Sequence, residues 1–172
     1  ARRRVLKTLW QELKERFAME NQGDIPPGAL WIHCASVGEV KSVQTLIKQL
    51  KSFYQKEVIV TTSTVAGRAE AAKNPDIKKA FLVPLDFYPF SNRFVRLAHP
   101  YRLFVVEREV WPNMIYAAQK AGVPVMLVNA RISQKSTRAY GLIKPLFEML
   151  FSQIALGAMQ DEDGAKRYAS LG

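Results

Sequence analysis

The chain has 172 residues, a formal net charge of +10 and a single cysteine, Cys34. One cysteine excludes an intrachain disulfide framework, and no apolar run is long enough to span a bilayer. The excess of basic residues favours an anionic partner, whether a nucleic acid, a membrane surface or a phosphorylated substrate. The length suits one domain with a sizeable hydrophobic core.

Residues 1–22 have the pattern of a basic amphipathic helix, in which leucines and Trp10 recur at helical spacing between arginines and lysines. Pro26 and Pro27 lie in the segment that separates this helix from the rest of the chain. Two interpretations are open. The helix packs on its own domain, or it lies on the surface near anionic lipid headgroups.

From residue 29 onward, short apolar runs alternate with helical patterns, which predicts βαβ units and a parallel sheet. The predicted strands are Leu30–Cys34, Val58–Val60, Phe81–Val83, Leu103–Val106, Val123–Val128 and Ile154–Met159. The predicted helices between them are Lys41–Phe53, Ala66–Lys73, Phe90–Leu97, Asn113–Ala121 and Ser136–Phe151. Because the apolar runs do not alternate with polar residues, helices are expected on both faces of the sheet. The predicted fold is a Rossmann-like α/β domain over residues 29–172.

Two segments near the C-terminus have a structural and a functional interpretation. The apolar stretch Leu142–Phe151 is predicted to be a helix that is kinked at Pro145 and buried against the sheet. A hydrophobic groove for a lipid or a partner domain is the alternative. The acidic residues 161–163 resemble a metal-binding triplet, but they are better explained as acids that open a helix.

Polar side chains follow five of the predicted strands. The strings are Ser36-Val37-Gly38-Glu39, Thr61-Thr62-Ser63-Thr64, Pro84-Leu85-Asp86, Glu107-Arg108-Glu109 and Asn129-Ala130-Arg131-Ile132-Ser133. Since the carboxyl ends of parallel strands meet at one edge, these residues are expected to share a site there. Their hydroxyl, carboxylate, amide and guanidinium groups suit a polyhydroxy, anionic ligand.

These strings also have structural explanations. Ser36 with Glu39 three residues later is the pattern of a capping box, and residues 61–64 could cap the following helix. Glu107 and Glu109 would share one face if their strand continued through them. Ser133 is predicted to be a helix N-cap, whereas Arg131 suits a phosphate or carboxylate.

Several familiar signatures are absent from the sequence. It contains no GxGxxG string after a strand, no phosphate-binding P-loop and no GxSxG elbow. No cluster of His and Cys residues suggests zinc. Of the two histidines, His33 is predicted to be a core or rim residue of the first strand, and His99, before a proline, is predicted to lie in a turn. We therefore expect no cofactor and no metal.

Four strings in this order closely resemble the 3-deoxy-D-manno-octulosonic acid (Kdo) transferases, glycosyltransferases of lipid A biosynthesis in Gram-negative bacteria. They are residues 31–39, 61–64, 107–113 and 129–133, with the sequences WIHCASVGE, TTST, EREVWPN and NARIS. The resemblance spans nearly the whole chain and implies the N-terminal half of a GT-B glycosyltransferase. It implies transfer of Kdo from CMP-Kdo to a lipid A precursor, with inversion and without an obligatory metal.

The resemblance also implies roles for individual residues. Glu39 matches the family's proposed catalytic base, which takes the proton of the acceptor hydroxyl. The candidate substrate-binding residues are Ser36, Gly38, Lys41, Thr62, Ser63, Thr64, Glu107, Glu109, Asn129, Arg131, Ser133 and Arg138. Lys41, Arg131 and Arg138 are the candidates for contact with phosphate.

The implied location is the cytoplasmic face of the bacterial inner membrane, on an anionic lipid surface. We expect the CMP-Kdo-binding C-terminal domain to be absent from this chain, so that the chain alone does not turn over CMP-Kdo. We also expect no membrane anchor in this chain. Two alternatives stay open: half of another GT-B sugar transferase, or a non-catalytic basic module that binds nucleic acid. The absence of interleaved aromatic and basic motifs argues against nucleic acid as the partner.

Overall fold

The computed structural model describes residues 2–19, 25–107, 111–130, 144–152 and 154–170. Within them, six strands pair into one sheet in the order β3-β2-β1-β4-β5-β6, and the pairs between neighbours are all parallel. The strands are β1 (Leu30–Cys34), β2 (Val58–Thr62), β3 (Ile77–Leu82), β4 (Arg102–Val106), β5 (Val125–Ala130) and β6 (Ile154–Met159). The predicted Rossmann-like α/β fold is confirmed.

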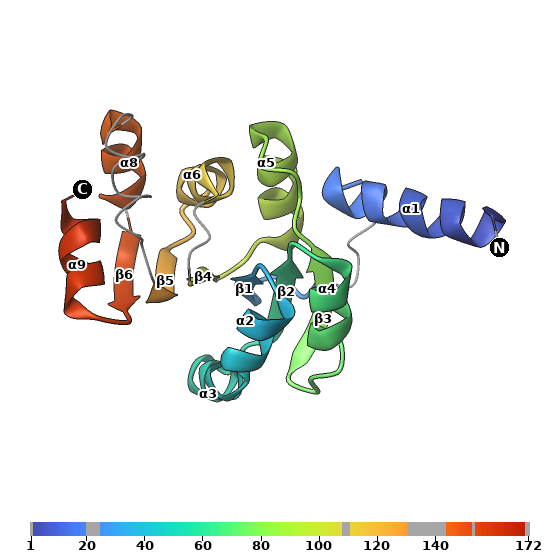
Figure 1. Ribbon diagram of the computed structural model, residues 1–172, viewed down its shortest axis with the longest axis horizontal. Coiled ribbons are helices and arrows are strands. Elements are labelled where there is room, and N and C mark those ends of the chain that lie inside the picture. Colours follow the sequence, from blue (N-terminus) through green and yellow to red (C-terminus); the bar gives the residue numbers. More distant parts are fainter. Residues whose placement is uncertain (1, 20–24, 108–110, 131–143, 153, 171–172) are drawn as a thin grey trace.

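Helices cover both faces of the sheet, as Figure 1 shows. They are α1 (Arg2–Arg16), α2 (Val37–Ser42), α3 (Gln44–Tyr54), α4 (Val65–Ala71), α5 (Tyr88–Ala98), α6 (Pro112–Lys120), α8 (Lys144–Phe151) and α9 (Glu162–Ala169). Helices α5, α6 and α8 lie on one side of the sheet, and α2, α3 and α4 lie on the other (Figure 1). This arrangement buries a hydrophobic core on each face.

Strand β1 contributes to both cores because its side chains point alternately to opposite faces. Trp31 packs with Phe94 in the core beneath α5 and α6, whereas Ile32 packs with Ile47 in the core beneath α3. All five residues of β1 are buried. A strand buried on both faces lacks a polar side, which explains its continuous apolar sequence.

The edge strand β3 is longer than predicted. It begins at Ile77, whereas the sequence pattern placed its start at Phe81. Lys78 is exposed and Lys79 half-buried, so the first half of the strand has the composition of a loop. Lysine is a frequent residue on edge strands because its charge prevents pairing with further strands.

Strands β2 and β5 both run into the polar strings that were assigned to loops. The β1–β2 ladder extends to the pair Cys34–Thr62, so two of the four hydroxyl residues belong to the strand. Strand β5 starts at Val125, after Pro124, rather than at Val123, and it includes Asn129. Proline has no N–H for a ladder hydrogen bond, which fixes this later start.

Two predicted helices differ from those in the structure. The segment predicted as one helix over residues 41–53 forms α2 and α3, which are separated at Val43 with backbone angles φ −103° and ψ 8°. Pro145 does not kink a helix, because α8 begins at Lys144 and the proline lies in its first turn, where its missing N–H is not needed. Residues 136–143 of that predicted helix lie outside the described residues.

The last turn of α1 is attached to the domain. The buried carboxylate of Glu15 pairs with Arg68 of α4, and the amide of Leu85 donates to the Arg16 carbonyl at 2.9 Å. Earlier in the helix, Leu9 and Trp10 are 51% and 61% exposed. In the described part of the chain, no helix combines the length and hydrophobicity needed to cross a bilayer.

Truncation of Phe94 tests the core beneath α5. Phe94 is 1% exposed, and its ring centroid lies 4.8 Å from that of Trp31 and 5.9 Å from that of Phe81. We expect Phe94→Ala to lower the free energy of unfolding by about 3–5 kcal/mol, measured by urea denaturation. Phe53, which is 80% exposed, is the control, and Phe53→Ala should change stability by about 0.5 kcal/mol or less. Equal losses for the two variants would contradict this packing.

Candidate functional site

The winding of the sheet changes direction between β1 and β4. From β1 the chain builds outward through β2 to β3, and it then crosses to β4 on the other side of β1 and continues to β5 and β6. In open α/β sheets, ligands bind at the carboxyl ends of the two strands that flank such a switch point. Here those ends continue into the β1–α2 turn and into Glu107.

The β1–α2 turn forms the predicted capping box in part, because the reciprocal bond of Glu39 reaches Ala35 rather than the N-cap Ser36. Ser36 is the N-cap of α2, and its Oγ accepts a hydrogen bond from the amide of Glu39 at 3.3 Å. In return, Glu39 Oε2 accepts from the amide of Ala35 at 2.7 Å. The Glu39 carboxylate is half-buried and held at the start of the helix, directly beside the switch point.

Gly38 lies exposed in the first turn of α2. A β-carbon at this position would lie 3.8 Å from Ser36 Oγ, an ordinary van der Waals distance. Packing within the chain therefore does not require a glycine here. Glycine leaves room for another molecule to approach the backbone of the turn.

Glu39 follows β1 and Glu107 follows the neighbouring strand β4, so both come after the carboxyl ends of adjacent parallel strands. Burial raises the pKa of the Cys34 thiol well above its ordinary value, and the negative charges of Glu39 and then Glu107 act in the same direction. Both carboxylates are therefore close enough to Cys34 for their fields to act on it. The structure brings together the two acidic residues that the sequence placed after different strands.

Glu107 does not extend strand β4. The strand ends at Val106, and Glu107 has a left-handed backbone with φ 60°. The condition under which Glu107 would share a strand face with Glu109 is therefore not met, because β4 ends before Glu107. Glu109 lies outside the described residues, as do three further predicted site residues, Arg131, Ser133 and Arg138.

Two of the three β2–α4 candidates have structural partners. Thr62 is buried and its hydroxyl donates to the carbonyl of Thr64 at 2.9 Å, while Thr64 Oγ1 accepts from the amide of Gly67 at 3.0 Å and caps α4. Ser63, between them, is half-buried, and its amide donates to the Ala35 carbonyl at 3.2 Å. This bond connects the β2–α4 turn directly to the β1–α2 turn.

Lys41 acts on a neighbouring carboxyl only through its charge, whereas Asn129 has a hydrogen-bond partner within the chain. Lys41 is exposed on α2 and, together with the hydrogen bond from Lys73, lowers the pKa of the Glu70 carboxyl on α4, with the Lys73 bond as the larger cause. Asn129, in a left-handed conformation, accepts from Gln160 at 2.8 Å through its Oδ1. The structure thus places Asn129 where the ends of β5 and β6 are joined.

A buried polar group lies on β1 and β2 beneath the site. Trp31 Nε1 donates to Thr61 Oγ1 at 2.8 Å, and Nδ1 of His33 lies 3.0 Å from the same oxygen. His33 also packs edge to face against Trp111, with ring centroids 5.5 Å apart. The prediction that His33 is a core or rim residue is confirmed, since it is fully buried, and the contact with Thr61 accommodates its Nδ1 there.

Asp86 lies in one of the polar strings at the strand ends, but the sequence assigned it no role. Its carboxylate accepts from the amides of Asn113 at 3.3 Å and Met114 at 2.9 Å, and its carbonyl accepts from Asn113 Nδ2 at 2.9 Å. Trp111, the N-cap of α6, makes no capping bond with its side chain. Asp86 therefore caps α6 from the β3–α5 loop.

Asp161 caps α9, with its carboxylate accepting from the Gly164 amide. Glu162 and Asp163 follow in the first turn, so the acidic triplet opens a helix as predicted. Across the described ranges, no three His, Cys, Asp or Glu side chains gather in a way that could hold a metal ion.

A doubly wound parallel sheet with two carboxylates at its switch point defines a ligand-binding α/β domain. The chain belongs to the 3-deoxy-D-manno-octulosonic-acid transferase (Kdo transferase) family, whose family model matches residues 11–172. The resemblance of the four sequence strings is confirmed by this match, which covers all of them.

Individual relatives agree with this assignment. A 3-deoxy-D-manno-octulosonic acid transferase from Haemophilus influenzae is 38% identical over 167 residues, which are 94% of this chain and 39% of the relative. One from Bordetella pertussis is 36% identical over 80% of this chain and 33% of its own length. A bifunctional glycosyltransferase/methyltransferase from Fusobacterium nucleatum is 34% identical over 83% of this chain and 23% of its own length. The chain therefore spans well under half the length of each of these relatives.

The raised pKa of Cys34 leads to a chemical test. Because thiolates, not thiols, are alkylated, we expect Cys34 of the folded chain to resist iodoacetamide at pH 8.5, where an ordinary cysteine is about half ionised. In denaturant the same thiol should react fully within minutes. Mass spectrometry measures both reactions. Rapid alkylation without denaturant would contradict the placement of Cys34 beneath the carboxylates.

Proposed function

We propose that this chain forms the acceptor-binding domain of an inverting Kdo transferase and that Glu39 is the general base. The observation that supports this role is the position of the Glu39 carboxylate at the β1/β4 switch point, in a chain that belongs to the Kdo transferase family. The acceptor is a lipid A precursor, and CMP-Kdo is bound by a C-terminal domain in the part of the relatives that this chain does not span.

The proposed reaction uses Glu39 at one step. An acceptor hydroxyl donates its proton to the Glu39 carboxylate as the hydroxyl oxygen attacks the anomeric carbon of Kdo. The new bond forms between that oxygen and the anomeric carbon, while the bond to CMP breaks and CMP leaves with the electron pair. The capping bond between Glu39 Oε2 and the Ala35 amide fixes the direction of the carboxylate before the acceptor arrives.

The remaining candidates divide into two groups. Gly38, Lys41, Ser63 and Glu107 lie in turns or on exposed surface around Glu39, and we propose that they contact the acceptor sugar or its phosphate. The other candidates within the described residues support the turns, since their side chains bond within the chain; they are Ser36, Thr62, Thr64 and Asn129. Glu109, Arg131, Ser133 and Arg138 remain proposed acceptor contacts.

Glu39→Gln separates catalysis from capping. The glutamine keeps a side-chain oxygen that can accept from the Ala35 amide, but it cannot take a proton from the acceptor. We expect the variant to keep its stability and to lose about 10²–10⁴-fold in kcat. The assay measures Kdo transfer from CMP-Kdo to a lipid A precursor by a hybrid enzyme, in which this chain replaces the 167 matching residues of the Haemophilus influenzae relative.

Glu70→Gln is the matched control, because Glu70 lies on α4 and bonds to Lys73 rather than facing the switch point. This variant should transfer Kdo at the unsubstituted rate. If the hybrid is active and Glu39→Gln retains most of that activity, then Glu39 is a capping residue and the base lies elsewhere. An inactive hybrid would count against the transferase assignment of the domain itself.

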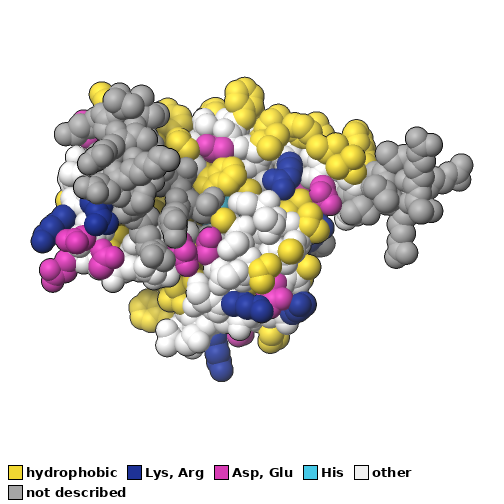
Figure 2. Space-filling view, viewed as in Figure 1, with side chains coloured by type: hydrophobic (Ala, Val, Ile, Leu, Met, Phe, Trp, Pro, Cys, Tyr) yellow, Lys and Arg dark blue, Asp and Glu magenta, His cyan; other side chains and the backbone are white. Residues whose placement is uncertain are grey.

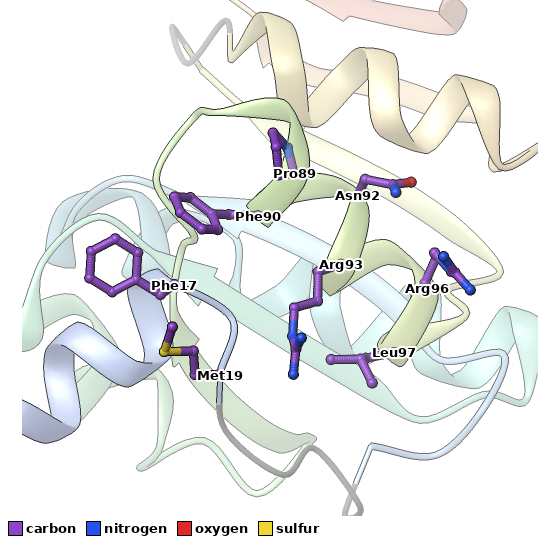
Figure 3. A pocket seen from close by; sticks show the side chains of 8 residues that line it. All are labelled: Phe17, Met19, Pro89, Phe90, Asn92, Arg93, Arg96 and Leu97. Atoms are coloured by element: carbon purple, nitrogen blue, oxygen red, sulfur yellow. The ribbon is translucent and has the colours of Figure 1, made fainter.

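We further propose that the surface formed by α1 and α5 contacts the anionic membrane from which the acceptor is taken. A groove of about 700 Å³ lies between Phe17 and Met19 at the end of α1 and the α5 residues from Pro89 to Leu97 (Figure 3). In Figure 2, hydrophobic side chains form a band along the same margin, over α5 and the described part of α1. A soluble protein exposes such a band chiefly where it binds something apolar.

Basic groups accompany this apolar surface. Arg93 extends from α5 between Met19 and Leu97, and Arg96 lies on the next turn (Figure 3). Apolar side chains flanked by arginines suit an interface that is part hydrocarbon and part phosphate. Because α5 starts at the carboxyl edge of the sheet, lipid held here would leave its sugar close to that edge. This arrangement supports a location on the cytoplasmic face of the inner membrane.

Charge reversal on α5 tests membrane contact. We expect the chain to sediment with phosphatidylglycerol vesicles more than with phosphatidylcholine vesicles. We expect the double variant Arg93→Glu/Arg96→Glu to bind phosphatidylglycerol vesicles at least about tenfold more weakly than the unsubstituted chain. The control Lys48→Glu/Lys78→Glu makes the same change in net charge at exposed positions on α3 and β3. Equal binding to both lipids, or equal weakening by both double variants, would refute the proposal that this surface contacts an anionic membrane.

A further inference from the structure

Glu15 is a buried acid that lies outside the polar strings at the strand ends. Its residue is 7% exposed, and its carboxylate pairs with Arg68 and accepts from the amide of Leu82 at 2.7 Å. Loss of the Arg68 charge would leave the buried Glu15 carboxylate without compensation, which is strongly unfavourable. The last turn of α1 is thus fixed against α4 and β3, and the next residue, Arg16, is fixed with it.

Arg16 starts a series of hydrogen bonds that ends at the proposed base. Its Nη2 donates to the carbonyl of Ser63 at 2.9 Å, and the amide of Ser63 donates to the carbonyl of Ala35 at 3.2 Å. The amide of Ala35 in turn donates to Glu39 Oε2 at 2.7 Å. The series passes from α1 through the β2–α4 turn to the β1–α2 turn.

The sheet itself does not fix the spacing of these two turns. The ladder between β1 and β2 ends at the pair Cys34–Thr62, one residue before Ala35 and Ser63. Beyond that pair, the bond from Ser63 to Ala35 joins the turns, and the Arg16 guanidinium holds Ser63 from the other side. A hydrogen bond from a charged donor is stronger than one between neutral groups, so the Arg16 bond adds a strong restraint on the Ser63 carbonyl.

We propose that Arg16 is a positioning residue for the Glu39 carboxylate and acts through Ser63 and Ala35, while the Glu15–Arg68 pair holds Arg16 in place. The part of this proposal that concerns catalysis rests on the proposed function, whereas the effect on the orientation of Glu39 does not. Because α1 also forms part of the proposed lipid surface, one helix would both contact lipid and orient the base.

The Ala35 amide is the direct reporter of this arrangement. Since this amide donates to the Glu39 carboxylate, its proton chemical shift follows the ionisation of Glu39 during an NMR pH titration. We expect Arg16→Ala to speed hydrogen exchange at Ala35 about tenfold or more and to reduce the pH-dependent change in its shift. Arg16→Met retains the apolar stem and should change exchange and titration at Ala35 as Arg16→Ala does. Arg16→Lys retains a charged donor, so it should keep part of the slow exchange and part of the pH-dependent shift.

Gln119→Ala is the matched control. Gln119 Nε2 donates to the Leu150 carbonyl at 2.9 Å, the same length as the Arg16 bond, but it joins α6 to α8 away from the series. The variant Gln119→Ala should leave hydrogen exchange and the pH-dependent shift at the Ala35 amide unchanged. Unchanged exchange and titration in Arg16→Ala would overturn the proposal, as would an equal response to Gln119→Ala. Unfolding of both Arg16→Ala and Arg16→Met would also overturn it, because Arg16 would then act only on stability.

Kinetics of the hybrid enzyme test the catalytic part separately. We expect Arg16→Met to lower kcat about tenfold, with little change in the KM for the lipid acceptor, and to shift the acidic limb of the pH profile of kcat. A rise in KM alone would overturn the positioning role. If the hybrid transfers no Kdo while the Ala35 amide responds as expected, the proposed function fails and the positioning of Glu39 by Arg16 stands.

Discussion

The central strand β1 has no free side, and the rest of the structure depends on this constraint. It is hydrogen-bonded to β2 and β4 along both edges and buried in a hydrophobic core on each face. A strand in this position cannot move without disturbing both cores, since protein interiors are packed as densely as organic crystals. Whatever follows β1 is therefore attached to the most rigid part of the molecule, and Glu39 follows it within five residues.

The β1–α2 turn combines two requirements that usually compete. A capping carboxylate must stay at the helix start, whereas a base must meet its substrate. In the proposed function Glu39 meets both requirements, because the cap fixes one carboxylate oxygen through the Ala35 amide at the edge of the sheet where ligands bind. Capping and the proposed catalytic role are therefore compatible at this position, although the sequence pattern of Ser36 and Glu39 presents them as alternatives.

The sequence predicted the sheet well because a strand buried on both faces leaves a clear apolar run, as at Leu30–Cys34. The edge strand Ile154–Met159 is mostly exposed but is also apolar, so the sequence identified it as well. It predicted β3 poorly because edge exposure admits lysines that resemble a loop. The strand-end rule located Glu39 and Glu107 correctly at one edge.

What the sequence could not predict are contacts between residues distant along the chain. The bond from Arg16 to Ser63 joins residues 47 apart, and Asp86 bonds to residues 27 and 28 positions away. Helical or strand periodicity describes how a segment faces the core, and it contains no information about which polar partner a side chain meets. An amphipathic pattern therefore identified α1 but not the function of its last turn.

The carboxylate of Asp86 at the start of α6 has a consequence for charge in the site. A helix N-terminus attracts anions because its first amides have no partners within the helix. In α6 those amides are already bonded to an anion that belongs to the chain itself. The start of α6 therefore offers fewer free amides to a phosphate than an uncapped helix would. The Glu39 carboxylate likewise lies at the start of α2, so attraction of a phosphate depends on cationic side chains such as the exposed Lys41.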